Sequence, residues 1–156
     1  MIVLEIPGRK AIQAAHLVLD FNGTLAVDGH LIEGVTGQLV RLSKHLEVHV
    51  LTADTFGTVR KQLEGLPVTV KVIDVAEQDR QKFEYVKELG ADRVIAVGNG
   101  RNDVLMLKGS ALGIGVIQAE GAFYEVLHSS QVVCTSITDA LDLLLNPKRL
   151  EATLRN

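Results

Sequence analysis

The sequence predicts an α/β fold in which a doubly wound parallel β-sheet is the middle of three layers, α/β/α. Short apolar runs with strand character alternate with segments of helical periodicity along most of the 156 residues. Strands joined by helices pair in parallel, and right-handed crossovers bring their carboxyl ends to one edge of the sheet. The length is that of one domain with a substantial hydrophobic core.

The expected core strands are short apolar runs, several of which end in a polar residue or a glycine. The first run ends in Asp20, the second in Thr52, and the fourth in a glycine-containing segment after Val97. A strand buried on both faces gives such a continuous apolar run. In chain order, the core strands are expected at 17–21, 47–52, 68–73, 93–97, 111–116 and 131–134. A small β extension is expected ahead of the core, at 2–6 and 11–15.

The segments between these strands carry helical periodicity or helix start signals. A short turn and hairpin at 24–32 come before the first helix, and Lys82 lies in an amphipathic segment. Asn102 and Asp103 stand directly before an apolar run, as residues at a helix N-terminus do. In chain order, helices are expected at 34–45, 55–64, 77–89, 102–108, 120–128 and 136–145, and the basic residues after 145 are expected on a solvated helix end.

Four polar residues at strand ends or helix starts form the candidate site. Asp20, Thr52, Lys82 and Asp103 follow one another in the order nucleophile, neutral donor, cation and metal carboxylate. A carboxylate is anionic at pH 7 and can attack phosphorus without a base, and the other groups balance charge around a phosphoryl group. Each residue also has a purely structural interpretation. Asp20 can be a strand cap before an Asn-Gly turn, and Thr52 can be a threonine that favours a strand. Lys82 can be an exposed helix lysine, and Asp103 can be a helix N-cap.

The motifs around these residues resemble those of haloacid dehalogenase (HAD) superfamily phosphatases. Residues 20–25, with sequence DFNGTL, are similar to the DKTGTL of P-type ATPases, and LTAD at 51–54 is similar to their LTGD. VGNGRND at 97–103 resembles VGDGIND, and ALGIG at 111–115 is similar to the family's next strand. The resemblance covers roughly residues 16–145 and most closely suggests a free-standing, soluble P-type ATPase-like protein. It implies a Rossmann-like HAD fold and a Mg²⁺-dependent phosphatase that works through an aspartyl-phosphate.

The resemblance also implies roles for individual residues. Asp20 would be the nucleophile, Thr52 would donate to a phosphoryl oxygen, and Asn22 occupies the acid–base position. Magnesium would be held by Asp20, the backbone carbonyl of Asn22, Asn99 and Asp103. We expect Lys82 to be the site cation, although an ungapped match to the pumps places Arg80 there. Asp54 either matches the aspartate of the pumps or caps the following helix.

Two positions depart from the family's pattern. Asn22 stands where these phosphatases have a second aspartate that protonates the leaving oxygen and then activates water, and an amide cannot exchange a proton near neutral pH. Asn99 stands where an aspartate usually lies beside the metal. We therefore expect slow turnover. The alternatives are a weak or silent protein that binds a phosphorylated ligand in a regulatory role, and a phosphotransferase that stops at the phosphoenzyme.

Composition and spacing limit the partners. The intervals from Asp20 to Thr52 and from Thr52 to Lys82 have no room for the cap domains of the family, so we expect an open site and a homo-oligomer. A phosphorylated small molecule or macromolecule would be the substrate. A net charge of −3 without tryptophan argues against nucleic acid. Without a membrane span or leader, we expect a cytoplasmic protein. The five histidines are expected to be scattered and to form no zinc site.

Overall fold

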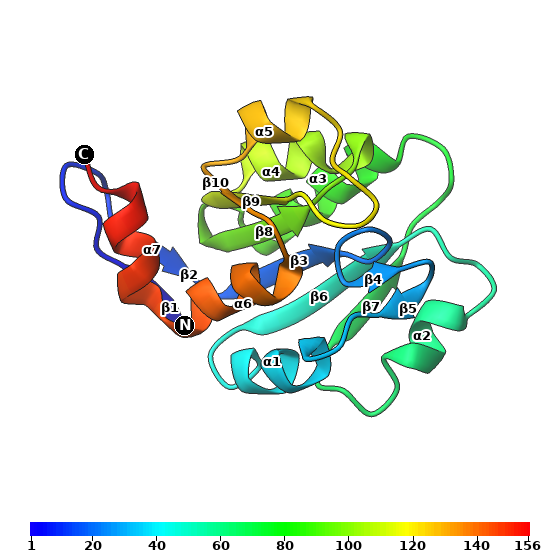
Figure 1. Ribbon diagram of the computed structural model, residues 1–156. Coiled ribbons are helices and arrows are strands. Elements are labelled where there is room, and N and C mark those ends of the chain that lie inside the picture. Colours follow the sequence, from blue (N-terminus) through cyan, green and yellow to red (C-terminus); the bar gives the residue numbers. More distant parts are fainter.

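The computed structural model describes residues 1–156 and contains a six-stranded parallel sheet as its middle layer (Figure 1). The strand order is β10-β9-β8-β3-β6-β7. The strands are β3 (His16–Asp20), β6 (Glu47–Thr52), β7 (Thr69–Val72), β8 (Val94–Gly98), β9 (Leu112–Val116) and β10 (Val132–Cys134). The chain moves outward from β3 to β7 and then returns to β8 on the other side of β3. The predicted doubly wound parallel sheet is thus confirmed, with its topological switch point beside β3.

Helices cover both faces of this sheet (Figure 1). On one face lie α3 (Gln78–Leu89), α4 (Val104–Gly109) and α5 (Glu125–Ser129), and on the other lie α1 (Val35–Leu42) and α6 (Ile137–Leu145). Short 3₁₀ turns, η1 (Ala91–Arg93) and η2 (Arg101–Asp103), come before β8 and α4. The predicted three layers are therefore present, and each predicted helix has a counterpart within a few residues.

The two faces of β3 belong to different parts of the hydrophobic core. Leu17 and Leu19 are in a cluster of 29 buried residues, while Val18 is in a separate cluster of 8. Successive side chains of a strand point to opposite faces, so an apolar run of this kind contributes to both helical layers. This burial on both sides fixes the position of Asp20, the last residue of the strand.

The segments after β3 and β6 are short. The hairpin of β4 (Ala26–Val27) and β5 (His30–Leu31) separates β3 from α1, and α2 (Thr58–Gln62) follows β6. No cap domain is inserted at either place, as the spacing predicts. The helix α2 is shorter than the expected 55–64, because Gly57, with φ of 80°, interrupts the chain before it.

The C-terminal end contains a helix that the sequence does not predict as a separate element. The helix α7 (Pro147–Leu154) begins with proline, whose fixed φ suits a first helical position. Its Leu150 is buried, and the Glu151 carboxylate accepts a hydrogen bond of 2.9 Å from the backbone N–H of Glu5. The helix covers the antiparallel pair of β1 (Ile2–Leu4) and β2 (Ile12–Ala14), so both chain ends lie at one side of the sheet (Figure 1).

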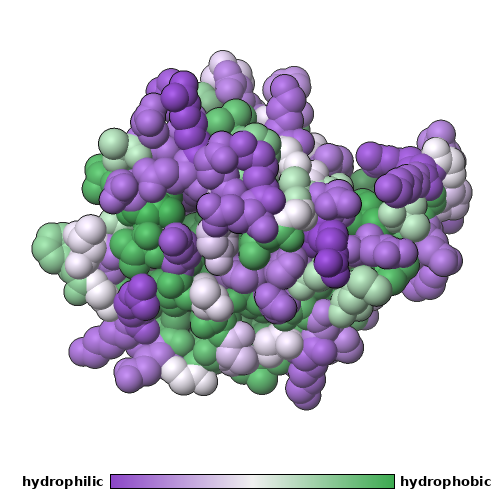
Figure 2. All heavy atoms as spheres, turned by 180° about the vertical axis from the view of Figure 1, so that it is seen from behind, coloured by the Kyte–Doolittle hydropathy of each residue, from purple (hydrophilic) through white to green (hydrophobic).

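On the face opposite to the view of Figure 1, hydrophilic side chains predominate, with apolar side chains between them (Figure 2). No helix has the length and apolar character needed to cross a membrane.

Substitution of Gly113 would test the close packing between β9 and α4. A Cβ atom at this position would lie 2.3 Å from the backbone oxygen of Leu107, which cannot move without shifting α4. We expect Gly113→Ala to lower the free energy of unfolding by about 2–3 kcal/mol. The matched control is Gly37→Ala in α1, where a Cβ meets nothing within 4 Å, and it should raise stability by up to about 1 kcal/mol. Urea denaturation of both variants measures the difference; equal midpoints would contradict the packing.

Candidate functional site

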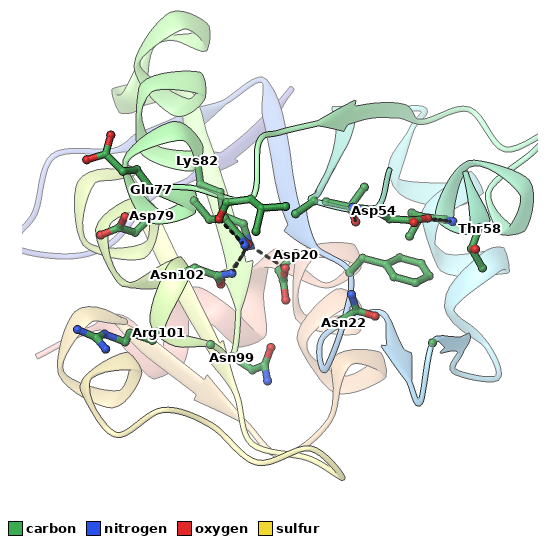
Figure 3. Close-up of a pocket in the computed structure, with 18 residues that line it drawn as sticks. Asp20, Asn22, Asp54, Thr58, Glu77, Asp79, Lys82, Asn99, Arg101 and Asn102 are labelled. Atoms are coloured by element: carbon green, nitrogen blue, oxygen red, sulfur yellow. Dashed lines mark hydrogen bonds and ion pairs between the residues drawn. The ribbon is translucent and has the colours of Figure 1, made fainter. Parts of the chain in front are cut away.

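A cavity of about 910 Å³ opens at the carboxyl edge of the sheet. The ends of β3 and β6, the loop after β8 and the start of α3 form its walls (Figure 3). Asp20, Asn22, Thr52, Lys82 and Asn99 all line it, so most of the predicted site residues meet in one place. The topological switch point of an open α/β sheet is where such folds bind ligands.

Lys82 connects the nucleophile candidate to a second carboxylate. Its Nζ lies 2.7 Å from Asp20 Oδ1 and 2.7 Å from Asp103 Oδ1, and the lysine is only 1% exposed. In Figure 3, Lys82 descends from α3 toward Asp20. A buried ammonium needs such partners, because an unpaired buried charge is strongly destabilising. Arg80 instead lies on the surface, where its Nη1 is 3.0 Å from Glu77 Oε1.

The pKa values of this group follow from burial and from the two carboxylates. Burial, together with the charge of Asp103, raises the pKa of Asp20 to about 6, against the opposing effect of Lys82. Burial disfavours the charged form of Lys82, but the attraction of Asp20 and Asp103 outweighs it and raises the pKa of the lysine. At neutral pH, Lys82 is therefore charged and Asp20 is an available carboxylate.

Asp103 lies beneath the cavity and does not line it. It has no exposed surface, its Oδ1 accepts from Lys82, and its Oδ2 accepts from the backbone N–H groups of Asn99 (3.0 Å) and Gly100 (2.9 Å). Both oxygens are thus engaged within the protein. This differs from the expected direct contact with a metal, and the geometry suits a residue that positions Lys82 and the loop after β8.

Thr24 contacts two residues that line the cavity, Asp20 and Asn99, a role that the sequence reasoning missed. Its Oγ1 lies 3.2 Å from Asp20 Oδ2 and 3.1 Å from Asn99 Oδ1. The Asn99 amide nitrogen donates to the carbonyl of Gly121 at 3.1 Å, which fixes the amide oxygen toward Thr24. The signal that could have identified Thr24 is its place in the motif at 20–25, two residues after Asn22. Gly23 has a φ of 79°, which favours glycine, and a Cβ there would also lie 2.4 Å from Asn99 Nδ2.

These oxygens fit a magnesium ion chemically. A hydroxyl has one proton, so Thr24 can donate to only one of Asp20 Oδ2 and Asn99 Oδ1 at a time, which leaves the other free to accept a cation. Mg²⁺ prefers few protein oxygens, with water and phosphate completing its shell. Asp20, Asn99 and the backbone carbonyl of Asn22 would supply these oxygens, with one carboxylate among them.

Thr52 and Asp54 lie on the opposite wall of the cavity. Thr52 is buried at the end of β6, and its Oγ1 accepts a hydrogen bond of 3.1 Å from the Asp54 backbone N–H. The Asp54 carboxylate accepts from the backbone N–H groups of Val59 (2.8 Å) and Phe56 (2.9 Å), and these bonds lower its pKa. Asp54 therefore holds the loop before α2, as the capping interpretation predicted.

The histidines are less scattered than expected. His16 and His49 lie on neighbouring strands with ring centroids 5.3 Å apart, and Glu47 lies beside them. Burial, with a further contribution from the charge of His16, lowers the pKa of His49. This group begins β3 and β6, at the sheet edge opposite to the cavity, so it is separate from Asp20.

Solved structures show which known fold the chain has. Two solved phosphatases have the same architecture. The cobalt-bound deoxy-D-mannose-octulosonate 8-phosphate phosphatase of Haemophilus influenzae has a TM-score of 0.71 at 14% identity, over 90% of this chain and 92% of that one. The 3-deoxy-D-manno-octulosonate 8-phosphate phosphatase of Moraxella catarrhalis, with magnesium, phosphate and KDO, has a TM-score of 0.66 at 16% identity, with 90% and 92% covered. Other matching structures are HAD-family hydrolases, and the chain therefore has the HAD fold.

Proteins similar in sequence match a smaller part of the chain than these structures do. No model of a known protein family matches the chain. The uncharacterized protein MJ0073 of Methanocaldococcus jannaschii is 52% identical over 73 residues, which are 47% of this chain and 78% of that protein. The chain belongs to the same family as MJ0073. The human probable phospholipid-transporting ATPase IM is 29% identical over 111 residues, 68% of this chain but 9% of the pump.

The raised pKa of Asp20 predicts that Asp20→Asn is more stable than the wild type at neutral pH. Keeping this carboxylate ionised in the folded protein costs on the order of 3 kcal/mol relative to the unfolded chain, because its pKa rises from 3.8 to about 6. Asp20→Asn removes that charge and keeps an oxygen near Lys82. We expect its melting temperature at neutral pH to exceed that of the wild type by about 5–10 °C.

The sign of the pH dependence is fixed by the direction of the shift. The wild-type carboxyl is protonated in the folded state below about pH 6 and in both states below about pH 4, so the advantage of Asp20→Asn shrinks across that window. Thermal unfolding at a series of pH values measures it. Asp92→Asn, at an exposed carboxylate, is the control and should show no such trend. A less stable Asp20→Asn at neutral pH would contradict the prediction.

Proposed function

We propose that this protein is a Mg²⁺-dependent phosphatase that transfers a phosphoryl group from a phosphate ester to Asp20 and then to water. The observation that carries the proposal is the Asp20 carboxylate at the switch point of the sheet, inside the cavity and 2.7 Å from the ammonium of Lys82. The HAD fold and the phosphatases that share it support the same reaction. The magnesium and phosphate bound by the Moraxella enzyme support the choice of metal.

The residues of the cavity divide the first step between them. An oxygen of Asp20 attacks phosphorus as the bond from phosphorus to the ester oxygen breaks. An aspartyl-phosphate forms, and the leaving alkoxide takes a proton from water to give the alcohol. Lys82 offsets the negative charge shared by Asp20 and the incoming phosphate, and the Thr52 hydroxyl would donate to a phosphoryl oxygen. Mg²⁺, when bound, supplies further stabilisation of charge on the phosphoryl oxygens. In the second step water attacks the phosphorus, which releases inorganic phosphate and restores the carboxylate.

The volume of the cavity favours a small phosphorylated substrate. A volume of about 910 Å³ is near the upper end of the range of about 300–1,000 Å³ that is typical of small-molecule sites. Glu77, Asp79 and Arg101 line the cavity on one side, and Asp54 lines it on the other (Figure 3). With no cap domain over it, the rim is also compatible with a phosphorylated side chain of a larger partner.

Asn22 favours a second candidate function, a phosphotransferase that stops at the phosphoenzyme. The residue lines the cavity two positions after Asp20, where an acid–base group would act on the leaving oxygen and on water. An amide can hydrogen-bond to either but cannot transfer a proton. Loss of positioned acid–base catalysis typically costs about 10²–10⁴-fold in rate. The phosphorylated state of Asp20 would then be long-lived.

The nucleophile is tested with para-nitrophenyl phosphate in the presence of Mg²⁺. We expect Asp20→Asn to reduce the rate by at least about 10³-fold, as removal of a catalytic nucleophile does. Chelation of the metal should abolish the wild-type rate. Asp92→Asn should leave the rate unchanged. Full activity of Asp20→Asn would refute this proposal.

Asn22→Asp tests which step limits the reaction. The substitution supplies a carboxyl that can exchange protons, so we expect the turnover number to rise by about 10²–10⁴-fold. Asn22→Ala, which lacks both the amide and the carboxyl, is the control and should not rise. Acid-quenched labelling measures the phosphoenzyme, which should accumulate in the wild type and decline in Asn22→Asp. An unchanged rate and phosphoenzyme level would show that Asn22 lies outside the proton path.

A further inference from the structure

The group of His16, Glu47 and His49 has the geometry of a metal site. His16 Nδ1 lies 3.2 Å from His49 Nε2 and 3.4 Å from Glu47 Oε2, and His49 Nε2 lies 4.0 Å from the same carboxylate oxygen. Zinc ligands lie about 2.0–2.1 Å from the ion, so two ligands of a tetrahedral site are about 3.3 Å apart. Two of the three separations match this spacing, and the third, from His49 Nε2 to Glu47 Oε2, is 4.0 Å and involves an exposed side chain that can move closer.

The register of the sheet brings these residues together. In the parallel pair of β3 and β6, His16 is opposite Glu47 and Val18 is opposite His49. Residues two apart on a strand point to the same face, so Glu47 and His49 share the face on which the neighbouring His16 lies. The two strands are held by the buried core, which fixes the backbone positions of the three residues without a contribution from loops.

A second contact orients the His49 ring. Its Nδ1 lies 2.9 Å from the Tyr85 hydroxyl on α3, which leaves Nε2 to face His16 and Glu47. Histidines that bind metals commonly have their other ring nitrogen engaged in this way. With Nδ1–H donating to the tyrosine oxygen, Nε2 carries the lone pair that a metal requires. The Glu47 side chain is 75% exposed, so water can reach the fourth position.

We propose that His16, Glu47 and His49 bind a divalent transition metal of the zinc type through Nδ1, Oε2 and Nε2, with water as the fourth ligand. The site shares no residue with the proposed phosphatase site. His16 and Asp20 are four positions apart on β3, which at strand spacing is about 13 Å. Imidazole nitrogens select zinc-type ions, whereas the oxygens around Asp20 suit magnesium. The ion would join β3 to β6 and, through Tyr85, to α3.

The test is calorimetric titration of Zn²⁺ into the full-length protein in an excess of Mg²⁺. We expect one Zn²⁺ per chain in the wild type and in Asp20→Asn, because the magnesium cavity is not involved. His16→Gln and Glu47→Gln should each weaken Zn²⁺ binding by at least about tenfold, since loss of even an outer-shell partner costs about that much. His128→Gln, at an exposed histidine on α5, is the matched control and should bind as the wild type does.

A second measurement separates lost binding from lost folding. Zn²⁺ should raise the melting temperature of the wild type and of His128→Gln, because an ion that binds only the folded state stabilises it. Glu47→Gln changes an exposed side chain, so its melting temperature without Zn²⁺ should match the wild type, and Zn²⁺ should raise it less. If the wild-type protein binds no Zn²⁺, His16 and His49 are only a hydrogen-bonded pair, and the proposal is overturned. Unchanged affinity in His16→Gln or Glu47→Gln, or loss of binding in Asp20→Asn, would overturn it as well.

Discussion

Lys82 is a buried cation between the carboxylates of Asp20 and Asp103, and the arrangement of the site depends on this contact. Two carboxylates and one ammonium leave a net negative charge in a region with little water. Backbone N–H groups of Asn99 and Gly100 offset part of it at Asp103, and the Thr24 hydroxyl offsets part at Asp20. Burial of Asp20, together with the charge of Asp103, still raises the pKa of Asp20 to about 6. A site with this residual charge is suited to a cation beside Asp20, and it carries an energetic cost while none is present.

Much of this arrangement follows from residue patterns that a sequence displays directly. The apolar runs that end in Asp20 and Thr52 lie on adjacent parallel strands, and that adjacency alone brings the two side chains to one edge. The helix with Lys82 returns across the same edge, because a right-handed crossover must. The position of Asp103 was harder to foresee. Its place in the motif shows that it is near the site, but only the three-dimensional path of η2 shows that it lies under Lys82 rather than in the cavity.

Contacts between elements distant in the chain account for what the sequence did not predict. His16 and His49 are 33 positions apart, and no spacing rule on one element connects them; the strand register does. In the same way, α7 is a separate helix because it packs against the β1–β2 pair, through Leu150 and the Glu5–Glu151 hydrogen bond. Pro147 is a local signal for the start of this helix. It does not show that the helix is stable, because that depends on the β1–β2 surface at the other end of the chain.

The helix α3 links the two polar groups on its side of the sheet. Lys82 and Tyr85 are three residues apart, so they lie on the same face of the helix, about one turn from each other. The first contacts Asp20 at the carboxyl edge of the sheet, and the second contacts His49 toward the amino edge. Between them, the apolar cluster that includes Val18, Leu51 and Val86 holds the helix against the strands. A shift of α3 along its axis would therefore change both contacts at once. The separation of Asp20 and His49 in space does not make their surroundings mechanically independent.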